Sequence, residues 1–444
     1  MPPALVAEVM NAPIIRGMDT DTLLERRARA MGPAYRLFYR QPVHLVRGEG
    51  VWLYDADGRK YLDCYNNVAS VGHCHPRVVE ALSRQAGTLN THTRYLHENI
   101  VQYAERLGGT MPGELSVCMF VCTGTEANDL AFRIARTVTG NEGAMVTDHA
   151  YHGNSLVITE FSTAEYPASE QPGYLETIEA PDGYRGTYRY SEPDLGQKYA
   201  NLAGGAISRL AERGKRPALF MSCNIFSSNG ILTPPPEYLQ GVYRHVRAAG
   251  GLAVADEVQS GLCRLGDNMW AFEDSDVIPD IVTVGKPMGD GHPLAAVVTT
   301  PAIAGEFARK FDYFNTFGGN PVSAAVGLAV LDVIEQEHIL QNVHDVGTYL
   351  KQGLKNLAQK YPLIGDVRGK GLFYGVELVT DQDSPEPAEN EAMRIRENLR
   401  ENGLLLSVTG RLNNVLKIRP PMVFSKNNAD ELLGKLGQAL DSIQ

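Results

Sequence analysis

The segment "DIVTVGKPMGDGHP", from Asp280 to Pro293, decides the fold prediction. Its first part is short, apolar and β-branched, and it gives way to a lysine, Lys286, where Gly, Pro and Asp begin. Open α/β sheets bind their ligands at the carboxyl ends of their strands. Most lysines are solvated surface charges. A lysine at the end of a buried strand is instead a candidate functional residue.

Similar short apolar runs recur along the chain, at residues 115–122, 143–148, 217–223 and 251–258. Segments with helical spacing separate these runs, and an earlier hairpin is expected around Asp57-Gly58. Near-continuous apolar strands that alternate with helices predict a mostly parallel sheet covered on both faces. The sequence therefore predicts an α/β fold.

The chain has 444 residues, a length that suits one large domain and a smaller companion. We expect residues 1–60 to be an N-terminal segment that contributes to the small domain. Residues 61–325 are expected to form the large domain, and residues 326–444 a C-terminal small α+β domain. Helices are predicted in that last part at residues 391–402 and 428–442.

The composition and net charge of the chain indicate which kinds of partner and cellular compartment to expect. The formal net charge is −11, and an acidic surface repels nucleic acid and anionic membranes, so neither is an expected partner. The six scattered cysteines suit a reducing compartment. The start "MPPALVAEVMNAPIIRG" lacks the basic region of a signal peptide, and no apolar run reaches the roughly 18 residues of a membrane span. We expect a soluble cytoplasmic protein. No metal site is expected, because "GHCHP" is too tightly spaced for zinc.

Three more features follow strands of the large domain. "TGTEA" (123–127) opens a helix, where Gly124 and Thr125 can bind a phosphate, although such turns are common. "DHAYHG" (148–153) places Tyr151 where its ring could cover a flat heterocycle; an ordinary packed tyrosine is the alternative. "GLAVADEV" ends a strand at Asp256, which can pair with a protonated ring nitrogen or cap a helix.

Together these features fit one ligand. A phosphate site, a stacking ring, a carboxylate for a ring nitrogen and a lysine for an aldehyde match the groups of pyridoxal phosphate (PLP). A partly desolvated lysine has a lowered pKa and becomes a nucleophile for aldehydes. The sequence therefore predicts a PLP site centred on Lys286.

With these motifs, the chain resembles the class III aminotransferases, which are PLP enzymes of fold type I (aspartate-aminotransferase-like). The resemblance runs from about residue 35 to the end. "DEVQSG" followed by "PDIVTVGKPMGDGHPLAAV" is close to a family signature. The resemblance implies that Lys286 forms the Schiff base with the cofactor and that Asp256 partners its ring nitrogen. It further implies cofactor contacts by Gly124, Thr125, Tyr151, Val258 and Gln259, and by Thr316 from the neighbouring subunit. A homodimer with shared sites follows, with a tetramer as the alternative.

Within the family, the phospho-lyases acting on ethanolamine phosphate and phosphohydroxylysine resemble this chain more closely. The shared pieces include "GHCHPRVV", "NTHTRYLHENIVQYAERL", "YRGTYR" and "NVLKIRPPM". These enzymes keep the PLP apparatus but eliminate phosphate and ammonia. The resemblance implies a small phospho- or phosphonoamine as substrate.

The chain departs from the family pattern at two places. Many class III transaminases carry a glutamate where Cys223 stands in "FMSCNIFSSNGI", and an arginine where Lys417 stands in "LKIRPP". Arg419 is expected next to Lys417, on the other face of the strand. Both halves of the usual carboxylate switch are therefore altered, which indicates a substrate that is not gripped through an α-carboxylate.

Two catalytic outcomes stay open from the sequence. One is a PLP lyase, with Arg94, Arg185 and Arg189 as candidates for binding an anionic group; surface ion pairs are the alternative for each. The other is an aminotransferase that passes the amino group to a 2-oxo acid or aldehyde, using the same lysine. A non-catalytic binding protein is a third possibility, against which the intact Lys286, Asp256 and phosphate loop argue.

Overall fold

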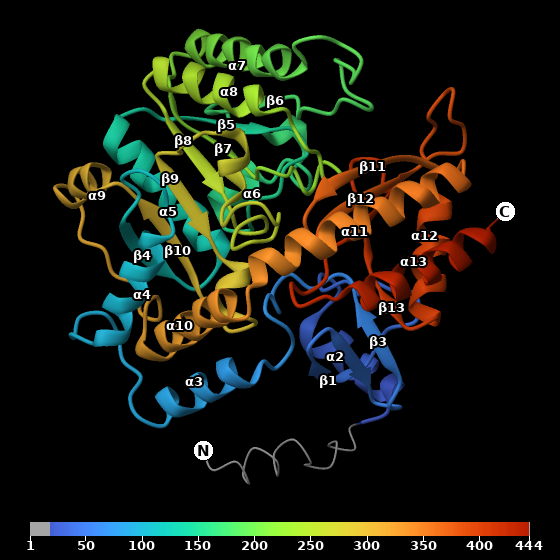
Figure 1. Ribbon diagram of the computed structural model, residues 1–444. Coiled ribbons are helices and arrows are strands. Elements are labelled where there is room, and N and C mark those ends of the chain that lie inside the picture. Colours follow the sequence, from blue (N-terminus) through green and yellow to red (C-terminus); the bar gives the residue numbers. More distant parts are fainter. Residues whose placement is uncertain (1–17, 444) are drawn as a thin grey trace.

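The computed structural model describes residues 18–443, and Figure 1 shows the path of the chain. The segment 1–17, on which the expectation of no signal peptide rests, lies outside the described residues. None of the helices in the described part is long and apolar enough to cross a membrane.

A seven-stranded sheet, in the order β4-β10-β9-β8-β7-β5-β6, forms the centre of the fold. Its strands are β4 (Val117–Val121), β5 (Gly143–Thr147), β6 (Leu175–Ile178), β7 (Pro217–Ser222), β8 (Leu252–Asp256), β9 (Ile281–Val284) and β10 (Ala295–Thr299). Only β10 runs antiparallel to its neighbours, β4 and β9. The predicted mostly parallel sheet is confirmed.

Helices cover both faces of this sheet because its strands are apolar on both sides. In β5, Ala144 and Val146 pack toward α5 (Gly124–Thr139), whereas Met145, between them, packs toward the opposite face. That opposite face is covered by α7 (Leu195–Glu212) and α8 (Pro236–Ala248). Alternate residues of a strand point to opposite faces, so the near-continuous apolar runs bury both sides.

Other helices frame the sheet and connect it to the rest of the molecule. Those of the first half are α2 (Thr20–Met31), α3 (Pro76–Ala86), α4 (Glu98–Gly109) and α6 (Leu156–Phe161), with the short η1 (Ala168–Glu170). Those of the second half are η2 (Ala271–Ser275), η3 (Lys286–Gly289), α9 (Pro301–Ala308), α10 (Pro321–Gln336) and α11 (Ile339–Lys360). The predicted domain boundary near residue 325 falls inside α10, which packs on α3 and α4. The division into domains stays a prediction.

Two smaller sheets flank the large one. The C-terminal sheet, in the order β11-β12-β15-β14, is covered by α11 and α12 (Glu389–Glu401), and α13 (Lys426–Asp441) packs on these two helices. Its strands are β11 (Ile364–Lys370), β12 (Phe373–Leu378), β14 (Ser407–Thr409) and β15 (Val415–Ile418). The N-terminal sheet contains β1 (Leu45–Glu49), β2 (Trp52–Asp55) and β3 (Lys60–Asp63), joined by β13 (Leu404–Leu405). The pairing of β3 with β13 ties the two ends of the described chain together, as the blue and red strands in Figure 1 show.

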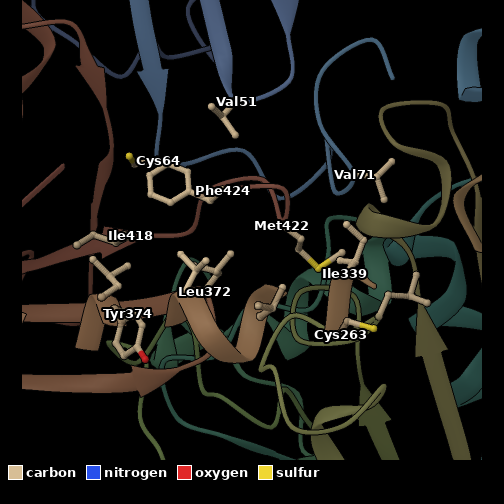
Figure 2. Close-up of a cluster of buried hydrophobic side chains, with 14 of the residues drawn as sticks. Val51, Cys64, Val71, Cys263, Ile339, Leu372, Tyr374, Ile418, Met422 and Phe424 are labelled. Atoms are coloured by element: carbon tan, nitrogen blue, oxygen red, sulfur yellow. The ribbon is translucent and has the colours of Figure 1, made fainter. Parts of the chain in front are cut away.

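The largest hydrophobic core lies where these units meet. Figure 2 shows Val51 of the N-terminal segment and Cys64, just after it, packed near side chains of the C-terminal part (Ile418, Phe424). The core continues through α10 and α11 to the central sheet, where Val282 and Val284 belong to the same cluster. The N-terminal segment is therefore held on the same core as the strand that precedes Lys286.

Candidate active site

A cavity of about 340 Å³ lies at the carboxyl ends of the central strands. Eight of the residues singled out in the sequence line it together: Gly124, Thr125, Tyr151, Cys223, Asp256, Val258, Gln259 and Lys286. They come from the loops that follow β4, β5, β7, β8 and β9. The parallel strands end at one edge of the sheet, which brings together residues up to 162 positions apart, from Gly124 to Lys286.

The helix α5 opens directly on this cavity. Thr123 caps the helix by accepting a hydrogen bond from the backbone N–H of Glu126 at 3.1 Å, so Gly124 and Thr125 form the first turn. A Cβ added at Gly124 would lie 2.7 Å from Cγ1 of Val258, so only glycine fits here. Free backbone amides and the helix dipole make this turn suitable for an anion.

Asp256 is held by three donors. Its Oδ2 lies 2.7 Å from Nδ1 of His152 and accepts from Nδ2 of Asn128 at 3.0 Å; its Oδ1 accepts from the backbone N–H of Val258 at 3.1 Å. The carboxylate is almost fully buried, at 4 % exposure. Thr283 orients the Asn128 amide by donating to its oxygen at 2.7 Å. The result is a fixed negative charge that faces the cavity.

Gln259 is oriented by an arginine. Arg419 donates a hydrogen bond to Oε1 of Gln259 and two more, at 3.3 and 3.2 Å, to the backbone oxygen of Tyr65. A guanidinium can only donate, so it turns the amide oxygen toward itself and leaves the amide NH₂ free to donate elsewhere. The side chain that lines the cavity is therefore a donor.

Lys286 follows β9 directly and begins η3. Among residues 18–443 its amine makes no hydrogen bond or ion pair with another side chain. Burial lowers the pKa of the Lys286 amine, and the nearby Arg419 lowers it further. Such an amine is a better base and nucleophile near neutral pH than a solvated lysine.

The thiol of Cys223 also lines the cavity. Burial raises the pKa of this thiol, and the charge of Asp256 raises it further, to a smaller extent. Lys417 lies nearby, since both Cys223 and Lys286 affect the pKa of its amine. The expectation that Arg419 faces away from Lys417 is wrong. Both cations lie over the ring of Phe373, at 5.6 and 5.3 Å from its centroid, because residues two apart in an extended strand share a face.

The cations beside the cavity lack carboxylate partners within the described chain. Lys417 is 8 %, Arg419 4 % and Arg264 1 % exposed, and none of the three forms an ion pair there. Burial is the main cause of a pKa for Lys417 well below its usual value, with Arg419 adding to it. Two nitrogens of Arg264, Nε and Nη2, have no hydrogen-bond partner either. This side of the cavity therefore gathers basic groups without a counter-charge.

Five other predicted residues do not line this cavity. Arg185 pairs with Glu377 and borders a separate cavity of about 460 Å³. Arg189 is exposed and donates to the backbone oxygen of Tyr184. Arg94 lies 4.0 Å above the ring of Phe314 at the surface. Thr316, in the same surface segment as Phe314, is exposed. Lys417 is buried and is not among the residues that line the cavity. The ion-pair alternative holds for Arg185.

Sequence reasoning missed several residues of the site. His152, Asn128, Cys122 and His292 also line the cavity. His152 stands in the quoted "DHAYHG", one residue after Tyr151, and Asn128 is a polar residue on the otherwise apolar buried face of α5. That polar interruption was the available signal. The Nε2 atom of His152 is buried and has no hydrogen-bond partner among the described residues, so it can meet a bound group.

Comparison with known proteins places this geometry in a family. The family model described as aminotransferase class-III matches residues 38–440. The chain belongs to the class III aminotransferase family. The "Alanine--glyoxylate aminotransferase 2-like" protein of Drosophila melanogaster is 43% identical to this class III chain, over 98% of it and 90% of the relative. The "Ethanolamine-phosphate phospho-lyase homolog 1" of Caenorhabditis elegans is 37% identical, over 95% and 93%.

Solved structures agree with the fold of this class III enzyme. A phospholyase from Arthrobacter in complex with phosphoethanolamine superposes with a TM-score of 0.92 at 44% identity, covering 95% of this chain and all 100% of the other. A Bacillus anthracis aminotransferase gives a TM-score of 0.86 at 28% identity, over 96% and 100%. The predicted fold type I is confirmed, and the family contains both aminotransferases and phospho-lyases.

Proposed function

We propose that this class III enzyme is a PLP-dependent phospho-lyase that releases phosphate and ammonia from a small phosphorylated amine. The observation that carries the proposal is the buried pair Lys417 and Arg419, next to Lys286, without a carboxylate partner in the described chain. A buried charge needs a counter-charge, and a phosphate on the substrate provides one. The phospholyase with phosphoethanolamine, similar over nearly the whole chain, supports this reading.

The residues of the cavity fit PLP. The first turn of α5 at Gly124 and Thr125, with its backbone amides, suits the cofactor phosphate, and the amine of Lys286, unpartnered in the described chain, suits its aldehyde. The buried Asp256 suits a protonated ring nitrogen, with Val258 and Tyr151 available for the ring faces. Bound there, the cofactor would supply an electron-accepting ring that stabilises negative charge on the carbon bearing the amine.

The protein groups have distinct tasks in this reaction. Lys286, with its lowered pKa, accepts a proton from the carbon that bears the amino group. Asp256, held by His152 and Asn128, keeps a negative charge fixed beside the site. Lys417 and Arg419 offset charge on the phosphate, which leaves from the neighbouring carbon with the bonding electrons. Water then completes the release of ammonia and an aldehyde.

Aminotransferase activity is the second candidate, because the relative at 43% identity carries an aminotransferase name. The two activities use the same lysine and differ in whether the substrate has a leaving group. A panel of amines, with inorganic phosphate, ammonia and oxo-acid-dependent turnover measured separately, tests the proposal. Phosphate and ammonia in equal amounts without an oxo acid support the lyase. Turnover of simple amines only with pyruvate or 2-oxoglutarate would replace it with transamination.

The assembly is proposed to be a homodimer with shared sites. The segments 95–96 and 314–317 expose large apolar side chains, among them Leu96 at 101 % and Phe317 at 69 %. Exposed apolar surface of this kind indicates a protein interface. Thr316 lies within it, which agrees with the expectation that Thr316 reaches the cofactor phosphate of the partner subunit. A tetramer and a cytoplasmic location stay predictions.

A further inference from the structure

The acidic groups around the cavity are each held by other partners. The charge of Asp63 still partly offsets the lowering of the pKa of Arg419, and Asp256 does the same for Lys286. Asp256 is engaged by His152, Asn128 and a backbone N–H. Asp63 is fully buried and lies 2.6 Å from Nε2 of His73. Glu257, next to Asp256 in the chain, is also fully buried, at 0 % exposure. None of these carboxylates forms an ion pair with Lys417 or Arg419.

Glu257 is fixed behind the wall by four donors. Its oxygens accept from Nδ2 of Asn224 at 2.8 Å, from Oγ of Ser260 at 3.1 Å, and from the backbone N–H groups of Ala271 and Phe272 at 3.0 and 3.1 Å. Asn224 therefore ties the turn after β7 to the turn after β8. Its chain neighbour Cys223 lines the cavity and packs on the cluster that contains Phe373.

A neutral thiol thus stands where a longer acidic side chain would neutralise the cations. Cys223 packs on the cluster that contains Phe373, and Lys417 and Arg419 both lie over the ring of Phe373, so both cations lie close to position 223. Lys286 lines the same cavity as Cys223. The thiol itself stays protonated, since burial raises its pKa. The protein therefore supplies positive charge on this side and leaves the counter-charge to the ligand.

We infer that Cys223 sets the charge requirement of the substrate, so that the enzyme selects amines carrying a dianionic group and rejects amines without one. The inference rests on the proposed function and names the feature that enforces its substrate class. An uncharged amine leaves Lys417 and Arg419 buried without a counter-charge, whereas a phosphate or phosphonate supplies it. Specificity here comes from the cost of the wrong ligand as much as from contacts to the right one.

The test uses the holoenzyme with Cys223→Glu and, as a matched control, Cys223→Gln, which has the same size without the charge. Inorganic phosphate binding is measured by calorimetry, turnover is measured for phosphoethanolamine, and ethylamine binding is measured from the absorption of the bound cofactor. In Cys223→Glu the new carboxylate pairs with the cations. We expect phosphate to bind at least about tenfold more weakly than to Cys223→Gln. The affinity for ethylamine relative to phosphate should rise in the same variant.

These measurements test the charge requirement set by Cys223 separately from the proposed phospho-lyase activity. Equal phosphate affinity in Cys223→Glu and Cys223→Gln would overturn the inference, since charge at position 223 would then not matter. If phosphate binding responds to charge but the wild-type enzyme releases no phosphate from any phosphoamine, the lyase proposal fails while the charge requirement stands. The absorption of the bound cofactor and the melting temperature verify that both variants are folded.

Discussion

Nδ1 of His152 lies 2.7 Å from Oδ2 of Asp256, with both side chains nearly fully buried. The imidazole orients the carboxylate that faces the proposed cofactor ring. Replacing Asp256 with Asn removes the fixed charge but keeps the shape. We expect the cofactor to stay bound and kcat to fall by at least tenfold to a hundredfold, the range for losing a charge-assisted hydrogen bond.

The measurement is kcat together with a pH titration of the cofactor absorbance. His152→Ala should shift the same titration in the same direction, because it removes a donor to Asp256. His149→Ala is the matched control, since His149 borders the second cavity. A normal titration in Asp256→Asn would mean that this carboxylate does not partner the ring.

Lys286→Ala should reduce turnover by roughly 10²–10⁴-fold or more, because the group that moves the proton is lost. Cofactor should still bind through the first turn of α5 and Asp256. Borohydride treatment of the wild-type enzyme should link the cofactor to Lys286, as read by peptide mapping. Lys310→Ala, at the surface, serves as the control. A label on any other lysine would overturn the assignment.

Lys417→Met should stabilise the ligand-free protein while weakening phosphate binding. Replacing a buried, unpaired amine, whose lowered pKa reflects its desolvation, by an apolar side chain of similar size removes this cost, which we expect to raise the free energy of unfolding by about 1–4 kcal/mol. Chemical denaturation measures it. Lys435→Met is the control, because the surface pair of Lys435 with Glu431 should contribute within about 0.5 kcal/mol. A destabilised Lys417→Met would show that the amine of Lys417 already has a compensating partner.

Anion binding should take up a proton at Lys417. Burial holds the pKa of this amine well below its usual value in the free protein, and a bound anion raises it. Between the lowered and the raised pKa, binding therefore adds a proton, and affinity falls as pH rises through this window. Calorimetry with sulfate, which does not itself titrate, in buffers of different ionisation enthalpy counts the protons. Binding without proton uptake in wild type, or unchanged uptake in Lys417→Met, would contradict the prediction.

The proposed interface predicts a coupling between assembly and cofactor binding. Leu96→Asp places a charge on the exposed apolar surface and should shift the protein to monomers with weaker cofactor affinity, because Thr316 of the partner is then missing. Sedimentation measures the oligomeric state, and titration with the cofactor measures its affinity. Ile278→Asp, at another exposed apolar position, is the control. Monomers of the wild-type protein with full cofactor affinity would remove the shared-site proposal.

The sequence predicted the parts of the fold and site that depend on local pattern. The apolar runs before Lys286 and Asp256 are β9 and β8, and the carboxyl edge of the sheet follows from their direction. What local pattern could not supply was contact across the chain. Arg185 looked available for a substrate until Glu377, 192 residues away, was seen to pair with it. The antiparallel β10 was missed because its residues are as apolar as those of its neighbours.

The short parallel pairing of Leu404 with Leu62 and of Leu405 with Asp63 has a consequence for biosynthesis. The strands β1, β2 and β3 leave the ribosome first. The fourth strand of their sheet, β13, emerges only after some 340 further residues have been added. Closing so long a loop is slow, and the sheet edge beside β3 stays open to wrong partners in the meantime. The central sheet can assemble during translation, while the N-terminal sheet must wait. The N-terminal sheet can therefore be completed only after β13, which lies between α12 and α13, has left the ribosome.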